Sequence, residues 1–171
     1  MDNLFRPRGL PTLIGSLPLT DHVEACELVL EHTPHIPLWI QLPAHKQEGM
    51  VAQFMPGLPG IFTTGDRVYI NSDKDDFEAD ILKFYEDYMA AEEGQIDLSE
   101  SRFILSEATA RGFFVFVERL KQLSTPPAAV KGQVTGPISW GLTVVDQDRR
   151  PVLYDEILAD AVAKHLRIKA C

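Results

Sequence analysis

The chain has 171 residues, of which 45% are hydrophobic and 24% are charged, and its formal net charge is -9 at pH 7. This length allows one buried core, so we expect a single domain over residues 1–171. The acidic charge argues against a nucleic-acid-binding surface, which requires clustered Lys and Arg. Cys26 and Cys171 are too few for a disulfide framework, and no stretch approaches the ~18 apolar residues of a membrane span. The composition therefore predicts a cytoplasmic protein with neither a nucleic-acid nor a membrane partner.

The N-terminal part of the sequence predicts a βαβ unit. Residues 12–14 form a short apolar run that ends at Gly15 and Ser16, and continuous apolar runs are typical of strands buried in parallel sheets. Residues 21–32 repeat apolar side chains at helical spacing. A second apolar run of strand length follows at residues 36–43.

The middle of the chain predicts a hairpin and two long helices. Residues 61–71 read as two short strands around a Thr-Gly-Asp turn, which indicates a β-hairpin inserted at the rim of the sheet. Residues 75–93 and 106–123 have apolar side chains at helical spacing. Within the second of these segments, the run FFVFV at residues 113–117 would also suit a strand. A short helix is expected over residues 48–55.

The C-terminal part predicts a third strand and a final helix. The strand candidate lies within residues 128–142, and the helix begins near Pro151, which is favoured at the first helical position. Strands that alternate with long helices imply a parallel α/β sheet. A complete (β/α)8 barrel takes about 250 residues. The predicted fold class is therefore α/β, a partial (β/α)8 TIM barrel comprising roughly the first half, with an inserted β-hairpin.

Polar residues at the ends of the predicted strands are the candidate binding site. Gly15 allows a close approach to the backbone, and the Ser16 hydroxyl can donate or accept a hydrogen bond. Gln41, Gln133 and Thr135 lie at the ends of the other apolar runs, and ligands of parallel α/β proteins bind at the carboxyl ends of strands. We expect these residues to line a small-molecule pocket. The alternative is that they cap nearby backbone groups.

A second candidate is a local zinc site near the first helix. His22 and Cys26 are four residues apart, and His32 and His35 lie near the end of the same helix. The favoured alternative is that Cys26 packs in the core and the histidines lie at the surface or near a helix end. Three charged residues that could meet a substrate are interpreted as solvated surface: Glu48, Asp66 and Arg67.

Three short motifs resemble the catalytic barrel of cobalamin-independent methionine synthase, a member of a superfamily that includes uroporphyrinogen decarboxylases. TLIGSLPLT at residues 12–20 contains the IGS of that family, MVAQF at residues 50–54 resembles its MVEYF segment, and VTGPIS at residues 134–139 resembles its LTGP strand end. WIQLP at residues 39–43 suits an uncharacterised branch of the superfamily better. The resemblance implies that the IGS residues, Ile14 to Ser16, contact the substrate.

The same resemblance implies methyl transfer from a methyl donor to a thiol in the intact parent protein. A zinc ion would activate the thiol, because a coordinated thiol is deprotonated at neutral pH. The family's zinc ligands come from the second half of its barrel, so we expect no cofactor in this chain, no activity of the chain alone, and no assignable catalytic residue. Ala52 and Gln53 stand where the family has Glu and Tyr.

The alternative function is a non-catalytic small-molecule-binding or assembly module. In either case, we expect a small-molecule ligand that is a thiol or an amino acid. An incomplete sheet leaves an unpaired strand edge and apolar helix faces. The sequence therefore predicts a homo-oligomer.

Overall fold

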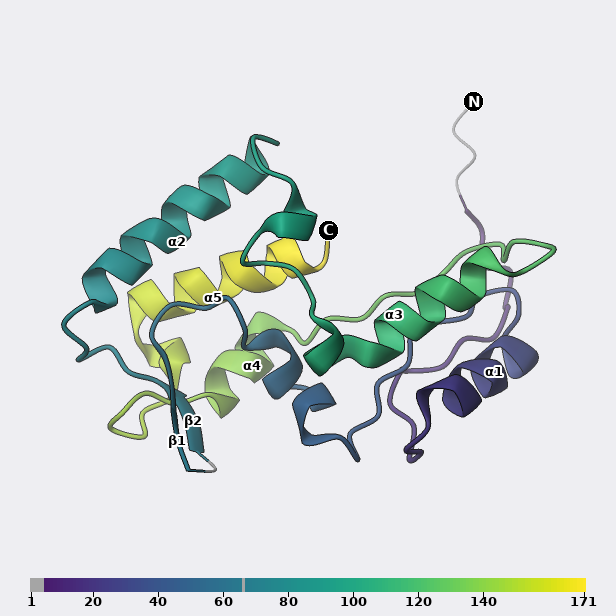
Figure 1. Ribbon diagram of the computed structural model, residues 1–171, viewed down its shortest axis with the longest axis horizontal. Coiled ribbons are helices and arrows are strands. Elements are labelled where there is room, and N and C mark those ends of the chain that lie inside the picture. Colours follow the sequence, from purple (N-terminus) through teal and green to yellow (C-terminus); the bar gives the residue numbers. More distant parts are fainter. Residues whose placement is uncertain (1–4, 66) are drawn as a thin grey trace. The chain divides into compact units, whose positions relative to one another are not determined.

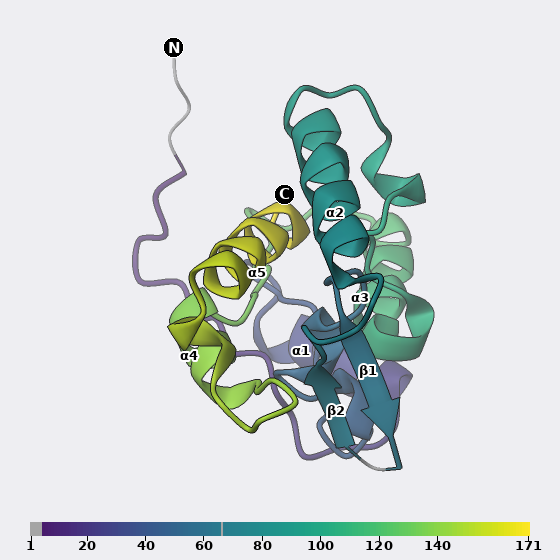
Figure 2. The same ribbon diagram turned by 90° about the vertical axis from the view of Figure 1, so that its left-hand side faces the viewer.

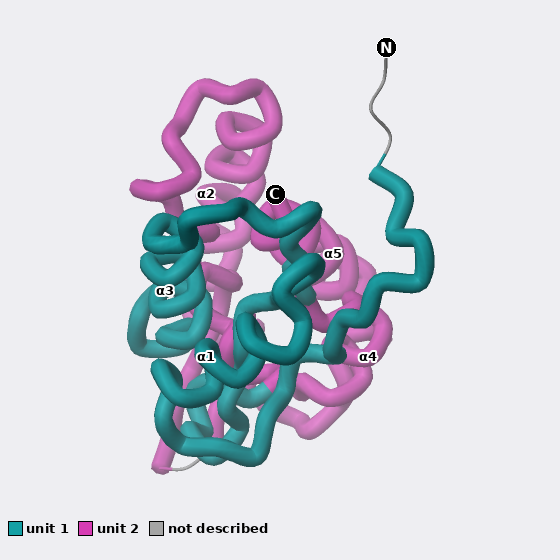
Figure 3. The backbone as a smooth tube through the Cα atoms, turned by 90° about the vertical axis from the view of Figure 1, so that its right-hand side faces the viewer, with its two compact units in different colours: residues 1–49, 106–133 teal, residues 50–105, 134–171 magenta. Residues whose placement is uncertain are grey.

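The computed structural model describes residues 5–65 and 67–171 (Figure 1). The chain forms two compact units, and each unit combines two separate stretches of sequence (Figure 3). Unit 1 comprises residues 1–49 and 106–133, and unit 2 comprises residues 50–105 and 134–171. The single domain over residues 1–171 stays a prediction.

Unit 1 contains the helices α1 (His22–His32) and α3 (Glu107–Lys121), which pack side by side (Figure 1). The Asp21 side chain caps α1, because it accepts hydrogen bonds from the backbone N–H groups of Val23 and Glu24, each at 2.8 Å. Both helices were expected from their periodicity, and both predictions are confirmed.

Helix α3 packs closely on the extended segment that contains Trp39 and Ile40. A Cβ atom at Gly112 would lie 2.1 Å from Ile40 O, so only glycine fits there. The Phe113 ring meets the Trp39 ring edge-on at 5.4 Å. The helix is kinked at Ala110, whose φ of -145° and ψ of 41° are not helical. The run FFVFV thus belongs to a helix, and its alternative interpretation as a strand is wrong.

The predicted half-barrel is wrong. The only sheet in the described part of the chain is two-stranded and antiparallel. The strand candidates at residues 12–14, 36–43 and 128–142 contain no strand. Isolated bridges join Leu38 to Lys131, and Gln41 to Ser16, which lies just after the first candidate.

Proline and exposure explain why these apolar runs do not form a sheet. Pro37 and Pro43 lie in the second run, which therefore lacks two N–H donors that a ladder needs, and Pro11 and Pro18 limit the length of any strand at the first. The first run is also exposed rather than buried, and the Ile14 side chain is 88% accessible. Apolar composition alone was therefore misleading here.

The C-terminal part of the third strand candidate, from Pro137 onward, is a helix in unit 2. Helix α4 (Pro137–Thr143) starts with proline at its first position, where the missing N–H costs nothing. Helix α5 (Glu156–Lys169) begins later than the sequence suggested, after Asp155, which accepts hydrogen bonds from two backbone N–H groups at 3.0 Å. Pro151 instead precedes a short 3-10 turn at Val152–Tyr154.

The core of unit 2 lies between α2 (Phe77–Glu92) and α5 (Figure 2). Its buried cluster comprises Phe84, Phe103, Ala161 and Ile168. The predicted helix over residues 75–93 is thus confirmed, while the segment predicted as a short helix over residues 48–55 contains a 3-10 turn at Ala52–Phe54 rather than an α-helix. Two further 3-10 turns lie at Lys46–Glu48 in unit 1 and Leu98–Glu100 in unit 2. None of the described helices has the length and apolar character needed to cross a membrane.

The predicted β-hairpin is present in unit 2. Strand β1 (Ile61–Thr64) pairs antiparallel with β2 (Arg67–Ile70), in the register Ile61 with Ile70. Arg67 is half-buried rather than solvated, and its guanidinium lies over the Tyr69 ring at 4.4 Å. Asp66, expected at the surface of the same turn, lies outside the described residues.

Candidate functional site

Two extended segments of unit 1 end side by side at Ser16 and Gln41, which form a parallel bridge. The Gln41 N–H donates to Gly15 O at 3.0 Å, and the Leu17 N–H donates to Gln41 O at 3.0 Å. These bonds hold Gly15 and Ser16 next to Gln41, as expected for carboxyl ends of parallel neighbours.

A third extended segment joins the other side of the second one and ends at Gln133. Leu38 and Lys131 form the parallel bridge, in which the Lys131 N–H donates to Pro37 O at 2.9 Å. The three segments therefore run in one direction, and their polar ends share one side of unit 1. Unit 1 thus provides the juxtaposition expected from the sequence without forming a sheet.

Gly15 and Gln133 are in direct contact. The φ of Gly15 is +147°, which L-residues rarely adopt, and a Cβ atom there would lie 2.5 Å from Gln133 Nε2. Glycine is therefore required for close approach to a side chain, whereas the sequence suggested close approach to a ligand. The Gln133 Nε2 group in turn donates to Trp39 O at 2.7 Å.

The other end of the Gln133 amide is unusual. Gln133 Oε1 is buried and accepts no hydrogen bond from any residue in the described part of the chain. A buried acceptor without a partner costs roughly 1–3 kcal/mol. The site therefore contains a buried oxygen whose capacity to accept a hydrogen bond is unused by the described residues.

The remaining two members of this group differ in exposure. Ser16 is exposed, whereas the Gln41 side chain is only 9% accessible. The structure thus brings together four of the predicted site residues, Gly15, Ser16, Gln41 and Gln133, and offers both a solvent-accessible hydroxyl and a buried amide oxygen.

Two predicted site residues are not part of this group. The Ile14 side chain lies at the surface, and the Ile14 carbonyl accepts a hydrogen bond from Lys131 Nζ at 2.5 Å. Thr135 belongs to unit 2, where its hydroxyl donates to Met50 O at 2.7 Å. The Thr135 hydroxyl thus caps a backbone carbonyl, which is the alternative role considered for this residue.

The local zinc candidates do not form a metal site. No group of three or more His, Cys, Asp or Glu side chains within residues 5–65 and 67–171 could hold a metal ion. Burial raises the pKa of the Cys26 thiol to about 11, so the thiol is protonated at neutral pH and is a poor metal ligand. The alternative interpretation, that Cys26 packs in the core, is confirmed. His22 lies at the helix end but is buried rather than exposed.

Sequence reasoning missed a buried hydrogen bond between two titratable side chains in unit 1. His22 Nε2 lies 2.7 Å from Glu48 Oε1, and Glu48 is only 3% exposed, so the prediction that Glu48 is solvated is wrong. The two residues are 26 positions apart, and neither belongs to a recognisable motif. Glu48 follows His45, Lys46 and Gln47, so its local sequence did not indicate burial.

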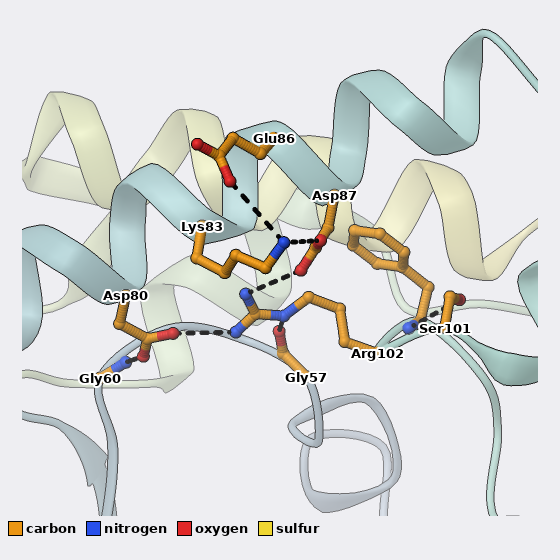
Figure 4. A network of polar contacts seen from close by, with 9 residues as sticks. Gly57, Gly60, Asp80, Lys83, Glu86, Asp87, Ser101 and Arg102 are labelled. Carbon is orange, nitrogen blue, oxygen red and sulfur yellow. Dashed lines mark hydrogen bonds and ion pairs between the residues drawn. The ribbon is translucent and has the colours of Figure 1, made fainter. Parts of the chain in front are cut away.

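Unit 2 contains an Arg102 network that is structural in character (Figure 4). The guanidinium donates to Gly57 O at 2.8 Å and to Asp80 Oδ1 at 3.0 Å, and it lies 3.6 Å from Asp87 Oδ2. Lys83 pairs with the same Asp87 at 2.9 Å. Through these contacts, Arg102 links the loop at Gly57 to α2, and its positive charge is paired with carboxylates of that helix.

No family model, no curated protein and no solved structure matches the chain.

Proposed function

We propose that unit 1 binds a small thiol at the ends of its three parallel segments. The observation that carries this proposal is the buried Gln133 Oε1, which lacks a donor among the described residues, beside the backbone of Gly15. A ligand ammonium or hydroxyl would satisfy that oxygen, and the exposed Ser16 hydroxyl would form a second polar contact. Both groups lie on the side of the segments where parallel α/β proteins bind ligands.

Within this proposal, the bound thiol is the acceptor of a methyl group in the intact protein. This part rests on the resemblance of the segments at residues 12–20, 50–54 and 134–139 to cobalamin-independent methionine synthase. The described residues do not fit the zinc ion of that family, because no suitable group of ligands exists among them. We therefore derive no step through a metal, and any zinc in the intact protein would need other ligands.

Binding of cysteamine, which carries a thiol and an ammonium group, tests the proposal. The loss of one hydrogen bond costs about 0.5–1.5 kcal/mol, so Ser16→Ala should weaken cysteamine binding by roughly two- to tenfold. Ser124→Ala is the matched control, because Ser124 is an exposed serine of the same unit. Isothermal titration calorimetry measures both affinities. Equal affinity of the wild type and Ser16→Ala would remove Ser16 from the site.

A second candidate function is a non-catalytic binding or assembly module. It is favoured by apolar side chains that remain exposed on α2, where Leu82 is 66% and Met89 is 59% accessible. Such faces often mark contacts with other proteins. We propose that copies of the chain associate through them. Light scattering coupled to size exclusion should then give a mass above 19.1 kDa, and Leu82→Glu should return it to that of the monomer.

We also propose that the protein acts in the cytoplasm. Cys26 and Cys171 are both free thiols, which is typical of a reducing compartment.

A further inference from the structure

Unit 1 has a polar hollow of about 420 Å³ next to the N-terminal parts of α1 and α3. None of its lining residues belongs to the Gly15 and Gln133 group. The hollow is lined by His22, His45, Gln47, Glu48, Glu107, Ala108 and Arg111. This volume lies within the range of small-molecule sites.

The base of the hollow is built around the Glu48 carboxylate. Glu48 accepts hydrogen bonds from the Leu42 N–H at 3.0 Å and the Arg111 N–H at 3.1 Å, in addition to its contact with His22. Since an ionised carboxylate only accepts, the His22 proton in this contact lies on Nε2. In the neutral ring, Nδ1 is then an acceptor.

A second histidine repeats this arrangement. The His45 ring stacks on the His22 ring with a centroid distance of 4.8 Å and an interplanar angle of 17°. His45 Nε2 lies 2.9 Å from Thr20 O, and a carbonyl only accepts, so this nitrogen also carries its proton. With the proton of each ring on Nε2, the Nδ1 atoms are the two ring nitrogens that can accept hydrogen bonds.

The wall of the hollow carries two opposite charges that do not pair with each other. Glu107 and Arg111 are exposed and four residues apart on α3, a spacing at which such residues commonly form an ion pair. The backbone departs from helical geometry at Ala110, between them. Within the described residues, neither side chain forms an ion pair. One guanidinium and one carboxylate thus remain available to a ligand.

We propose that this hollow binds a small zwitterion of the α-amino-acid class. The planar Arg111 guanidinium binds the ligand carboxylate through two parallel hydrogen bonds. The Glu107 carboxylate and the two histidine Nδ1 atoms accept hydrogen bonds from the ligand ammonium. A ligand with only one charge would leave one wall group without a partner. This site does not depend on the proposed thiol site, because the two share no residue.

Calorimetric titration with glycine, acetate and methylammonium tests this inference. We expect glycine to bind more tightly than either single-charge probe. Arg111→Gln should weaken glycine and acetate binding at least tenfold, since hydrogen bonds to charged groups contribute strongly. Glu107→Gln should weaken glycine binding by a similar factor but leave acetate binding unchanged. Both side chains are exposed, and the Arg111 N–H bond to Glu48 survives the substitution, so both variants should fold.

The matched controls are Glu118→Gln and Lys121→Gln, an exposed ion pair on the same helix but outside the hollow. Neither control should change glycine affinity, and Ser16→Ala should also leave it unchanged. The inference is overturned if glycine does not bind, if Glu107→Gln binds glycine as tightly as the wild type, or if acetate binds as tightly as glycine.

Discussion

Replacement of Gly112 by alanine is expected to destabilise unit 1 by about 3 kcal/mol, at the upper end of the usual cost of overpacking. The added Cβ atom would lie 2.1 Å from Ile40 O and 3.0 Å from Ile40 Cγ1. The nearest atom is a backbone oxygen, which cannot move aside as a flexible side chain can. Helix α3 and the segment that contains Ile40 would have to separate. Chemical denaturation followed by circular dichroism measures the change.

Gly132→Ala is the matched control in the same unit. The nearest atom to a Cβ at Gly132 is Trp39 Nε1 at 4.0 Å, an ordinary contact distance. The control should change the free energy of unfolding by less than about 0.5 kcal/mol. If both variants unfold at the same denaturant concentration, the close packing of α3 against residue 40 is incorrect.

Acid is expected to destabilise unit 2 through His165. Burial lowers the pKa of His165 to about 3, and the positive charges of Lys169 and Arg102 act in the same direction. His165 Nε2 lies 2.9 Å from Phe54 O, while Nδ1 is buried and has no hydrogen-bond partner among the described residues. The folded protein therefore contains a neutral histidine with no partner for a second proton.

The direction of the pH effect follows from proton uptake by the unfolded chain. Unfolded histidine binds a proton near pH 6.5, whereas folded His165 binds one only near pH 3. The unfolded state holds more protons between these values, so stability falls as the pH decreases from 6.5 to 3 and is restored above 6.5. The slope is about 1.4 kcal/mol for each pH unit, and the total is about 4–5 kcal/mol.

Urea denaturation at a series of pH values measures this contribution. His165→Leu should be less stable than the wild type at pH 7, because it loses the bond to Phe54 O, but its stability should fall less between pH 6.5 and 3. His32→Leu is the control, since His32 is exposed on α1 and should retain the wild-type acid dependence. If the stability of His165→Leu fell with decreasing pH as steeply as that of the wild type, His165 would not be the source of the acid sensitivity.

The helices of this protein were predictable because their apolar periodicity agrees with their packing. Helix α2 places Phe84 in the core of unit 2, as its spacing indicates. The β-hairpin was also predictable from two short runs around a Gly-containing turn. The strands predicted at residues 12–14 and 36–43 are absent. An apolar run does not report whether its N–H groups can pair. Prolines within and beside these runs were the overlooked signal.

Part of the candidate site was predictable although the predicted barrel is absent, because the parallel direction of the segments does not depend on a barrel. Gly15, Ser16, Gln41 and Gln133 each lie at the end of an extended segment, and parallel segments place such ends together even when joined by single bridges. The contact between His22 and Glu48 could not be predicted, because it depends on how a 3-10 turn packs against two helices. Distant pairs of this kind are set by tertiary packing rather than by local pattern.

Nuclear magnetic resonance of the 15N-labelled chain during titration with cysteamine tests the central claim most directly. The Gln133 side-chain amide and the backbone amides of Gly15, Ser16 and Gln41 should shift together and saturate at one ligand concentration, because the ligand ammonium donates to Gln133 Oε1. Absence of shifts at these four residues at saturating cysteamine, or shifts confined to Glu107 and Arg111, would contradict the proposal that the ends of the three parallel segments form the binding site.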